Sequence, residues 1–223
     1  MICYHRIRPV NSDDNEGTRE MVATISQFEA QIKWLVDNKY SFLSPDDVYR
    51  YYTDLAYTPP AQAVLITIDD GYATAYDNGL PVLNKYGIKA AWFIMTIPLD
   101  KDGFLTKEQV RGLDKAGHYI CAHTYSHQNL PTQTDEQLAT EIAGGLKELE
   151  EIVGHKISYF AYPFGAWDRH VVDKVREYGL KMAFQLKDPT DPQVPLYTVR
   201  RELITSYDPL DTFIGKVRDP QTW

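Results

Sequence analysis

Runs of apolar residues alternate with amphipathic stretches along most of this chain. A continuous apolar run such as AVLITI at residues 63–68 is typical of a parallel strand that is buried on both faces. Similar runs recur at intervals that leave room for a helix between them. The strands expected on this basis are residues 2–5, 63–68, 90–95, 118–123, 157–163, 181–186 and 196–204, with a short apolar piece at 40–43.

The segments between these strands carry helical periodicity and helix start signals. Apolar residues from Phe28 to Leu35 recur at helical spacing, and Ser26 is the expected N-cap of that helix. Ser44 is expected to cap a second helix, with Pro45 at its first position. The other expected helices span residues 73–86, 106–117, 134–153 and 168–179, and the polar, acidic residues 11–24 are expected to form a loop.

This alternation of strand and helix predicts a parallel sheet with helices outside it. Seven or eight strands within 223 residues favour a small or incomplete barrel over an open sheet, and one domain over residues 1–223. In such barrels the chemistry lies at the carboxyl ends of the strands. A functional site is therefore expected at those ends.

Composition and charge narrow the classes of function. The formal charge of −8 disfavours binding to nucleic acid, because an acidic surface repels phosphate. No apolar run approaches the roughly 20 residues that cross a bilayer, and the first residues lack a signal-peptide pattern. The abrupt ends leave room for a longer protein. Cys3 and Cys121 are expected to be buried thiols rather than a disulfide scaffold.

Two strand ends carry residues that can bind a metal ion. Asp69 and Asp70 follow a buried strand, where two adjacent carboxylates are costly unless something pairs with them. A helix N-cap beside a solvated turn residue is the structural alternative. His123 and His127 follow another strand, and two imidazoles four residues apart can converge on one ion. Position 124 is Thr, so this is not the HExxH signature, and two unrelated surface histidines are the alternative.

Taken together, the two strand ends are more informative than either alone. Two histidines and one carboxylate make a facial set of three ligands with open positions, which suits a catalytic divalent metal. The spare aspartate can then act as a base toward water. A third strand end, FAYPFG at residues 160–165, holds a tight turn whose N–H groups could serve as oxyanion donors, or it is an ordinary loop.

The motifs ITIDDGY, HTYSH and YPFG, in this order, resemble those of the polysaccharide deacetylase family, the carbohydrate esterases of the NodB-homology type. The resemblance covers about residues 60–200. It implies a distorted (β/α) barrel of seven strands. It also implies a metal-dependent hydrolase that removes acetyl groups from N-acetylated sugars, at an extracellular or cell-envelope location. The abrupt ends of the chain would allow such a domain to be part of a longer cell-envelope protein.

The same resemblance assigns roles to individual residues. Asp69 would be the general base, and Asp70, His123 and His127 would hold the metal, Zn²⁺ first, with Co²⁺, Ni²⁺ and Fe²⁺ fitting the same ligands. The backbone N–H of Phe164, after Pro163, would bind the oxyanion. The aromatic residues near the motifs, of which we expect no more than half to stack on sugar rings, are Tyr72, Tyr162, Phe164 and Trp167.

Two departures from the family pattern point to other residues. Ala161 stands where most members have an arginine that braces the catalytic aspartate, and Arg200 and Arg201 are the candidates to replace it. No histidine follows His170, so the usual C-terminal acid histidine is missing. His5 ends the first strand, on the side where the chemistry is expected.

His5 connects the chain with one subgroup of the family. YHRI ahead of a DDGY motif, the missing arginine and the FAYPFG form resemble the deacetylases of poly-β-1,6-N-acetylglucosamine. That resemblance implies a circularly permuted barrel with His5 as general acid, whereas His118, His155 and His170 lie in less suitable places. The alternatives are a deacetylase of chitin oligomers or peptidoglycan, and a non-catalytic carbohydrate-binding barrel.

Overall fold

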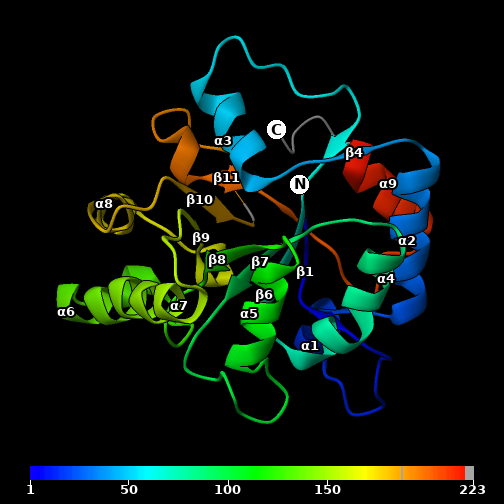
Figure 1. Cartoon of the computed structure of the whole chain (residues 1–223), viewed down its shortest axis with the longest axis horizontal. Helices are drawn as coiled ribbons and strands as arrows, with labels where there is room; N and C mark the ends of the chain where they lie inside the picture. The colour runs from blue at the N-terminus through cyan, green and yellow to red at the C-terminus, as the bar shows by residue number, and fades with distance from the viewer. Residues whose placement is uncertain (187, 219–223) are drawn as a thin grey trace.

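A computed structural model describes residues 1–186 and 188–218. Its centre is a barrel of parallel strands, and every neighbouring pair in the sheet is parallel (Figure 1). Around the sheet, the strands follow one another as β11 (Val199–Arg200), β10 (Met182–Gln185), β9 (Tyr159–Ala161), β8 (Tyr119–Ala122), β7 (Ala91–Ile94), β6 (Ile66–Asp70), β1 (Ile2–Tyr4) and β12 (Glu202–Leu203).

The barrel closes within one short segment near the end of the chain. Only Arg201 separates β11 from β12. The Arg201 N–H donates to the Gln185 carbonyl of β10 at 3.1 Å, and the Glu202 N–H donates to the Met1 carbonyl beside β1 at 2.9 Å. The segment thus stops pairing with β10 and begins pairing with β1 at Arg201. Taken as a single strand, it gives the seven-stranded distorted barrel expected from the sequence.

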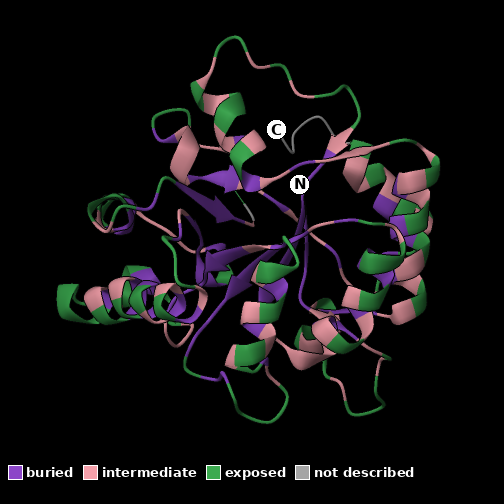
Figure 2. Ribbon diagram, in the orientation of Figure 1, coloured by how far each residue is buried: buried purple, intermediate pink, exposed green. Residues whose placement is uncertain are grey.

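Two apolar clusters fill the inside and the outside of this barrel. The inner cluster includes Phe93 and Phe184, whose ring centroids are 5.2 Å apart, and Cys121. Leu43 and Val48 belong to the same inner cluster. The outer cluster lies between the strands and the surrounding helices, which turn buried faces toward the sheet and exposed faces to solvent (Figure 2). Strands buried on both faces explain the continuous apolar runs of the sequence.

The helices follow the expected order with local differences. They are α1 (Glu16–Glu20), α2 (Ile25–Asp37), α3 (Pro45–Thr53), α4 (Leu80–Lys85), α5 (Lys107–Lys115), α6 (Asp135–Leu138), α7 (Gly145–Val153), α8 (Arg169–Glu177) and α9 (Leu210–Arg218). π-helical turns, η1 (Ala75–Gly79) and η3 (Ala139–Gly144), precede α4 and α7, and the short 3₁₀ turns are η2 (Leu130–Thr132), η4 (Pro163–Gly165) and η5 (Pro195–Tyr197). In the part of the chain that the structure describes, no helix is long and apolar enough to cross a membrane.

Two expectations about the N-terminal region were wrong. Helix α2 is capped by Thr24 rather than Ser26, because Thr24 and Gln27 exchange side-chain-to-backbone hydrogen bonds in a capping box. Residues 11–24 are not all loop, since they contain α1 and the strand β3 (Val22–Ala23), which pairs with β2 (Arg6–Ile7). A second small sheet joins β4 (Ser41–Phe42) to β5 (Ala63–Val64).

Candidate active site

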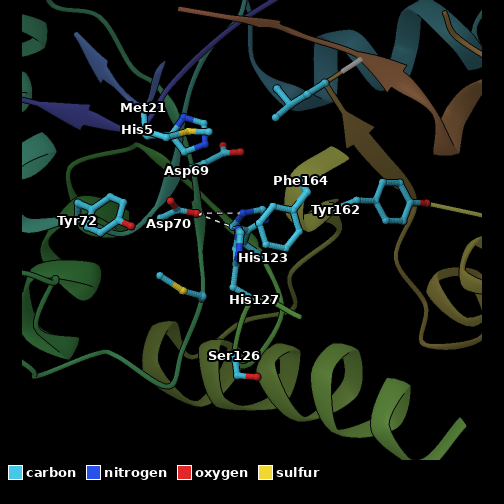
Figure 3. A pocket seen from close by; sticks show the side chains of 12 residues that line it. His5, Met21, Asp69, Asp70, Tyr72, His123, Ser126, His127, Tyr162 and Phe164 are labelled. Carbon is cyan, nitrogen blue, oxygen red and sulfur yellow. Dashed lines mark ion pairs between the residues drawn. The ribbon is translucent and has the colours of Figure 1, made fainter. Parts of the chain in front are cut away.

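A cavity of about 440 Å³ opens at the carboxyl ends of the barrel strands (Figure 3). The five residues expected to carry acid–base and metal chemistry all line it, and these are His5, Asp69, Asp70, His123 and His127. Its other lining residues are Met21, Tyr72, Met95, Ser126, Tyr162, Phe164 and Leu186. Residues far apart in the sequence therefore meet where parallel strands end, as the barrel rule predicts.

The two adjacent aspartates of β6 both face this cavity. Neighbouring side chains in a regular strand point to opposite faces, so two consecutive residues cannot normally share one site. Asp70 has φ of 72°, in the left-handed region that Asp tolerates better than most residues. This backbone conformation ends the strand alternation at Asp70. Asp69 can then point into the barrel while Asp70 faces its mouth.

Arg201 holds Asp69 inside the barrel. Its guanidinium donates two hydrogen bonds of 2.7 Å to the two carboxylate oxygens, and both side chains are at most 1% exposed. The guanidinium also lies 4.8 Å from the ring centroid of Phe93. Burial opposes ionisation of Asp69, but the charge and hydrogen bonds of Arg201, together with the nearby His123 and His5, outweigh it, so the pKa of this carboxyl is lowered. Arg201 therefore braces the aspartate, while Arg200 pairs with Glu202 at 2.6 Å.

Asp70, His123 and His127 converge on one point. The Nε2 atoms of His123 and His127 lie 3.2 and 3.3 Å from Asp70 Oδ1. His123 Nδ1 is 2.8 Å from the Ala161 carbonyl, which can only accept, so Nδ1 carries a proton and Nε2 is the ring nitrogen that can bind a cation. Asp70 Oδ1 is buried without a hydrogen-bond partner among the described residues. Two imidazole nitrogens beside an unsatisfied carboxylate oxygen form a set of ligand atoms that fits a divalent cation.

The loop that carries His127 is supported by a helical segment, η3 and α7, that the sequence analysis did not connect with the site. Glu141, in η3, is 5% exposed and accepts a hydrogen bond of 2.9 Å from the Ser126 N–H. Gly145 lies so close to this loop that a Cβ there would be 2.7 Å from the Thr124 carbonyl carbon. The π turn η3 and the first residue of α7 thus place Glu141 and Gly145 against the loop that carries His127. The pair Gly144–Gly145 within an otherwise helical stretch is the sequence signal for it.

His5 reaches the cavity from the end of β1. It is 5% exposed, and its Nδ1 lies 3.9 Å from the Sγ atom of Cys3, the residue two positions earlier on the same strand face. Burial lowers the pKa of the His5 imidazole, and the nearby charges of Asp70 and Asp69 oppose that shift. Cys3 and Cys121 are both free, buried thiols, as expected.

The remaining histidines lie away from the cavity. His118 is buried, and its Nδ1 accepts from the Ala90 N–H at 3.2 Å and the Trp92 Nε1–H at 3.3 Å. Burial, helped by the charge of Lys89, lowers the pKa of His118 to about 4, so its ring is neutral near pH 7. His155 and His170 are exposed and pair with aspartates. Of the six histidines, only His5 lines the cavity beside the two metal-ligand candidates.

The structure places two of the four expected sugar-stacking aromatic residues with their rings at the cavity. The Tyr72 ring stacks on Phe104 with a centroid distance of 5.0 Å, and Phe164 is 54% exposed beside His127. The Tyr162 ring points away from the ligand cluster into the outer core (Figure 3). Trp167 lies outside the cavity because it packs against that same core.

The turn η4, which contains Phe164, has an unusual backbone conformation that brings it close to Leu186. Phe164 has φ of 59° within the short turn η4. Gly165 follows with φ of 66°, and a Cβ there would be 2.7 Å from the Leu186 backbone nitrogen. Pro163 is buried and belongs to the wall of the turn rather than to the cavity lining. Non-glycine residues with positive φ at Asp70, Thr124, His127 and Phe164 thus surround the cavity, where strained backbone commonly marks function.

Comparison with known proteins places this fold and site in a family. The family model described as "Polysaccharide deacetylase" matches residues 56–183, which is more than half of the chain. The protein YxkH of Bacillus subtilis (strain 168) is 31% identical over 182 residues, which cover 82% of this chain and 62% of that protein. The chain therefore spans less than two thirds of the length of this relative.

Two further comparisons extend the match to almost the whole chain. The "Poly-beta-1,6-N-acetyl-D-glucosamine N-deacetylase" of Staphylococcus aureus (strain MRSA252) is 28% identical over 226 aligned residues, covering 91% of this chain and 77% of that protein. The structure of the Streptococcus pyogenes deacetylase PplD in complex with acetate superposes with a TM-score of 0.88 at 21% identity, covering 98% of this chain and 97% of that one. The barrel, the motifs and the family model agree, and the chain belongs to the polysaccharide deacetylase family of hydrolases, which act on N-acetyl amide bonds in polysaccharides.

Proposed function

We propose that this protein is a metal-dependent N-deacetylase of a polymer of N-acetylglucosamine, first of all poly-β-1,6-N-acetylglucosamine. The observation that carries the proposal is the meeting of His5 with Asp69 and the Asp70–His123–His127 cluster in one cavity. An acid from the first strand replaces the histidine that the C-terminal part of the chain lacks. The name of the staphylococcal relative supports the β-1,6-linked substrate.

Asp70, His123 and His127 would hold the divalent cation, with Zn²⁺ as the first candidate and Co²⁺, Ni²⁺ and Fe²⁺ suited to the same ligands. Such an ion, when bound, lowers the pKa of a water molecule and polarises the amide carbonyl. The site has three protein ligands rather than four, so positions remain for substrate and water.

Asp69 and His5 would move the protons of the reaction. Asp69 is ionised and fixed by two hydrogen bonds from Arg201, so it can accept a proton as water attacks the acetyl carbon. The N–H of Phe164 would stabilise the oxyanion that develops on the acetyl group. His5 would donate a proton to the nitrogen as the C–N bond breaks, which gives acetate and a free amine on the sugar.

The open mouth of the cavity suits a polymer. The exposed ring of Phe164 offers a face on which a sugar ring can stack. The faces of the Tyr72 ring are covered by Phe104 and Arg6, so Tyr72 can contact a sugar only through its ring edge or its hydroxyl. The guanidinium of Arg6 lies 3.8 Å from the Tyr72 ring centroid and holds that ring in place. We include in the proposal an extracellular or cell-envelope location, which the family resemblance implies.

Acetate release from defined oligomers tests the proposal. The protein, loaded with Zn²⁺, is expected to release acetate faster from β-1,6-linked than from β-1,4-linked N-acetylglucosamine oligomers. A chelator should stop the reaction, and added metal should restore it. Faster release from the β-1,4 oligomers would assign the protein to chitin-type substrates. Binding of oligomers without any acetate release would show a carbohydrate-binding barrel instead.

Replacing His5 with asparagine should lower turnover by about 10²- to 10⁴-fold, the usual contribution of a positioned general acid. Metal bound at the Asp70–His123–His127 cluster should stay unchanged at one equivalent, because His5 is not among the three ligand candidates of that cluster. Acetate release and elemental analysis of the same sample measure both quantities. His170→Asn is the matched control, since this exposed histidine pairs with Asp135 away from the cavity. Full activity in His5→Asn would disprove the acid assignment.

A further inference from the structure

A second set of metal-binding atoms lies in the same barrel beside the first. Cys3 lies on β1 and His5 directly follows that strand, while Asp69 lies on the neighbouring strand β6. The Cys3 Sγ, one His5 ring nitrogen and an Asp69 carboxylate oxygen all lie within 4.8 Å of one another. None of these three residues belongs to the Asp70–His123–His127 cluster.

The spacing of these atoms is close to that of a tetrahedral zinc site. Bonds of about 2.3 Å to sulfur and about 2.0 Å to nitrogen place two ligands of a tetrahedral ion about 3.6 Å apart. The Cys3 Sγ and His5 Nδ1 atoms are 3.9 Å apart, so a small adjustment brings them into range. Asp69 keeps acceptor capacity, because each of its oxygens uses one lone pair on Arg201 and has a second.

We propose that Cys3, His5 and Asp69 form a second, weaker site for a thiophilic divalent cation, and that an ion bound there inhibits the enzyme. The inhibition rests on the proposed function, because such an ion would occupy both groups assigned to proton transfer. The binding does not rest on it. Water from the cavity, which His5 and Asp69 both line, would complete the coordination.

Two features make this site weaker than the first. The Cys3 thiol is fully buried, which raises its pKa well above the ordinary value, so an incoming ion must displace a firmly held proton. Arg201 also places a positive charge on the far side of Asp69. The first ion should therefore fill the Asp70 cluster, and the second should bind only when metal is in excess.

Sulfur distinguishes the two sites experimentally. The first cluster offers only nitrogen and oxygen, whereas the second includes a thiolate, the ligand that soft and borderline ions prefer. Co²⁺ reports the difference directly, because a Co²⁺–thiolate bond gives a charge-transfer absorption in the near ultraviolet. Titration of the metal-free protein with Co²⁺ should show no such band with the first equivalent and a growing band with the second.

Two cysteine variants test the assignment. Cys3→Ser and Cys3→Ala should both lose the band, while Cys121→Ser, which replaces the other buried free thiol, should keep it. Circular dichroism confirms that each variant is folded, and two replacements at Cys3 guard against the failure of one. A wild-type protein without the band at saturating Co²⁺, or a band that persists in folded Cys3→Ser, would overturn the proposal.

Inhibition by excess Zn²⁺ tests the consequence separately. Each protein is compared with its own uninhibited rate of acetate release. The Zn²⁺ concentration that halves the rate should be at least roughly tenfold higher for Cys3→Ser than for the wild type. Replacing a residue that only supports a metal ligand already changes metal affinity by about this factor. Equal zinc sensitivity of Cys3→Ser and wild type would disprove the inhibitory role. If the protein released no acetate from any oligomer, the proposed function would fail, and the Co²⁺ band would still decide whether the site exists.

Discussion

Replacing Arg201 with alanine is expected to destabilise the folded protein by about 3–5 kcal/mol, because it leaves a buried carboxylate without its partner. Arg201 is fully buried, and its two 2.7 Å hydrogen bonds to Asp69 are joined by a third, of 3.0 Å, to Thr67 Oγ1. Urea unfolding of the variant and the wild type measures the change in free energy. Activity should also fall, because Asp69 loses the groups that orient it and keep it ionised.

A second variant separates charge loss from shape loss at this position. Asp69→Asn combined with Arg201→Met removes both charges, and such replacements of a buried pair are often neutral for stability. The double variant should therefore regain much of the lost stability and still release no acetate. If Arg201→Ala alone cost less than about 1 kcal/mol, the ion pair would not have the structural weight that its burial indicates.

Replacing His123 with alanine is expected to remove both the metal and the activity. His123 is 2% exposed, and its ring is oriented by the Ala161 carbonyl, so no other side chain can easily take its place. Loss of one of only three protein ligands leaves too few bonds to retain the ion through dialysis. Elemental analysis of dialysed protein measures the metal, and acetate release measures the activity.

Asp69→Asn is the matched comparison for this prediction. Asp69 neighbours the ligand Asp70 in the sequence, but it pairs with Arg201 and lies outside the Asp70–His123–His127 cluster. The variant should therefore keep one equivalent of metal, at that cluster, while losing most of its turnover. Retention of a full equivalent of metal in His123→Ala would contradict the ligand assignment. Loss of metal in Asp69→Asn would exchange the roles of the two aspartates.

The sequence motifs predicted which residues meet in the cavity. They did not predict how the adjacent residues Asp69 and Asp70 can both face it. The strand ends at Asp70 and His123 were expected to converge because parallel strands of one barrel end on the same side. Strand alternation alone would have turned Asp69 and Asp70 to opposite faces. The left-handed backbone at Asp70, followed by Gly71, resolves that conflict. Backbone conformation of this kind depends on the tertiary surroundings and cannot be derived from local residue preference.

The structure decides between Arg200 and Arg201 through strand alternation. Val199 belongs to the inner apolar cluster, so the residue two positions later shares its direction into the barrel. Arg201 is that residue. A place at a strand end does not by itself separate the two arginines, because the direction of each side chain depends on the register of this last strand. The structure shows that the strand changes partner at Arg201 itself.

The N-cap of helix α2 and the position of Trp167 were mispredicted or left open because neighbouring residues gave competing local signals. Thr24 and Ser26 are both good N-cap residues, and Gln27 at the third helical position decided for Thr24. Trp167 lies close in sequence to the FAYPFG turn, yet its large apolar ring packs into the outer core. Proximity in sequence to a motif is thus weak grounds for placing a side chain in a site, because burial of apolar area competes with it.

The switch of partner at Arg201 also has a consequence for how the molecule gains its activity. Asp69 lies beside His5, which follows β1, and beside Arg201, which joins β11 to β12. Nearly the whole chain separates His5 from Arg201 in the sequence. Contacts of such long sequence separation form slowly, because the entropy of closing a large loop must be overcome before they contribute. A refolding molecule can therefore regain its helices and most of its sheet while the last strand is still unpaired. Recovery of catalysis would report the closing of the barrel rather than the formation of its parts.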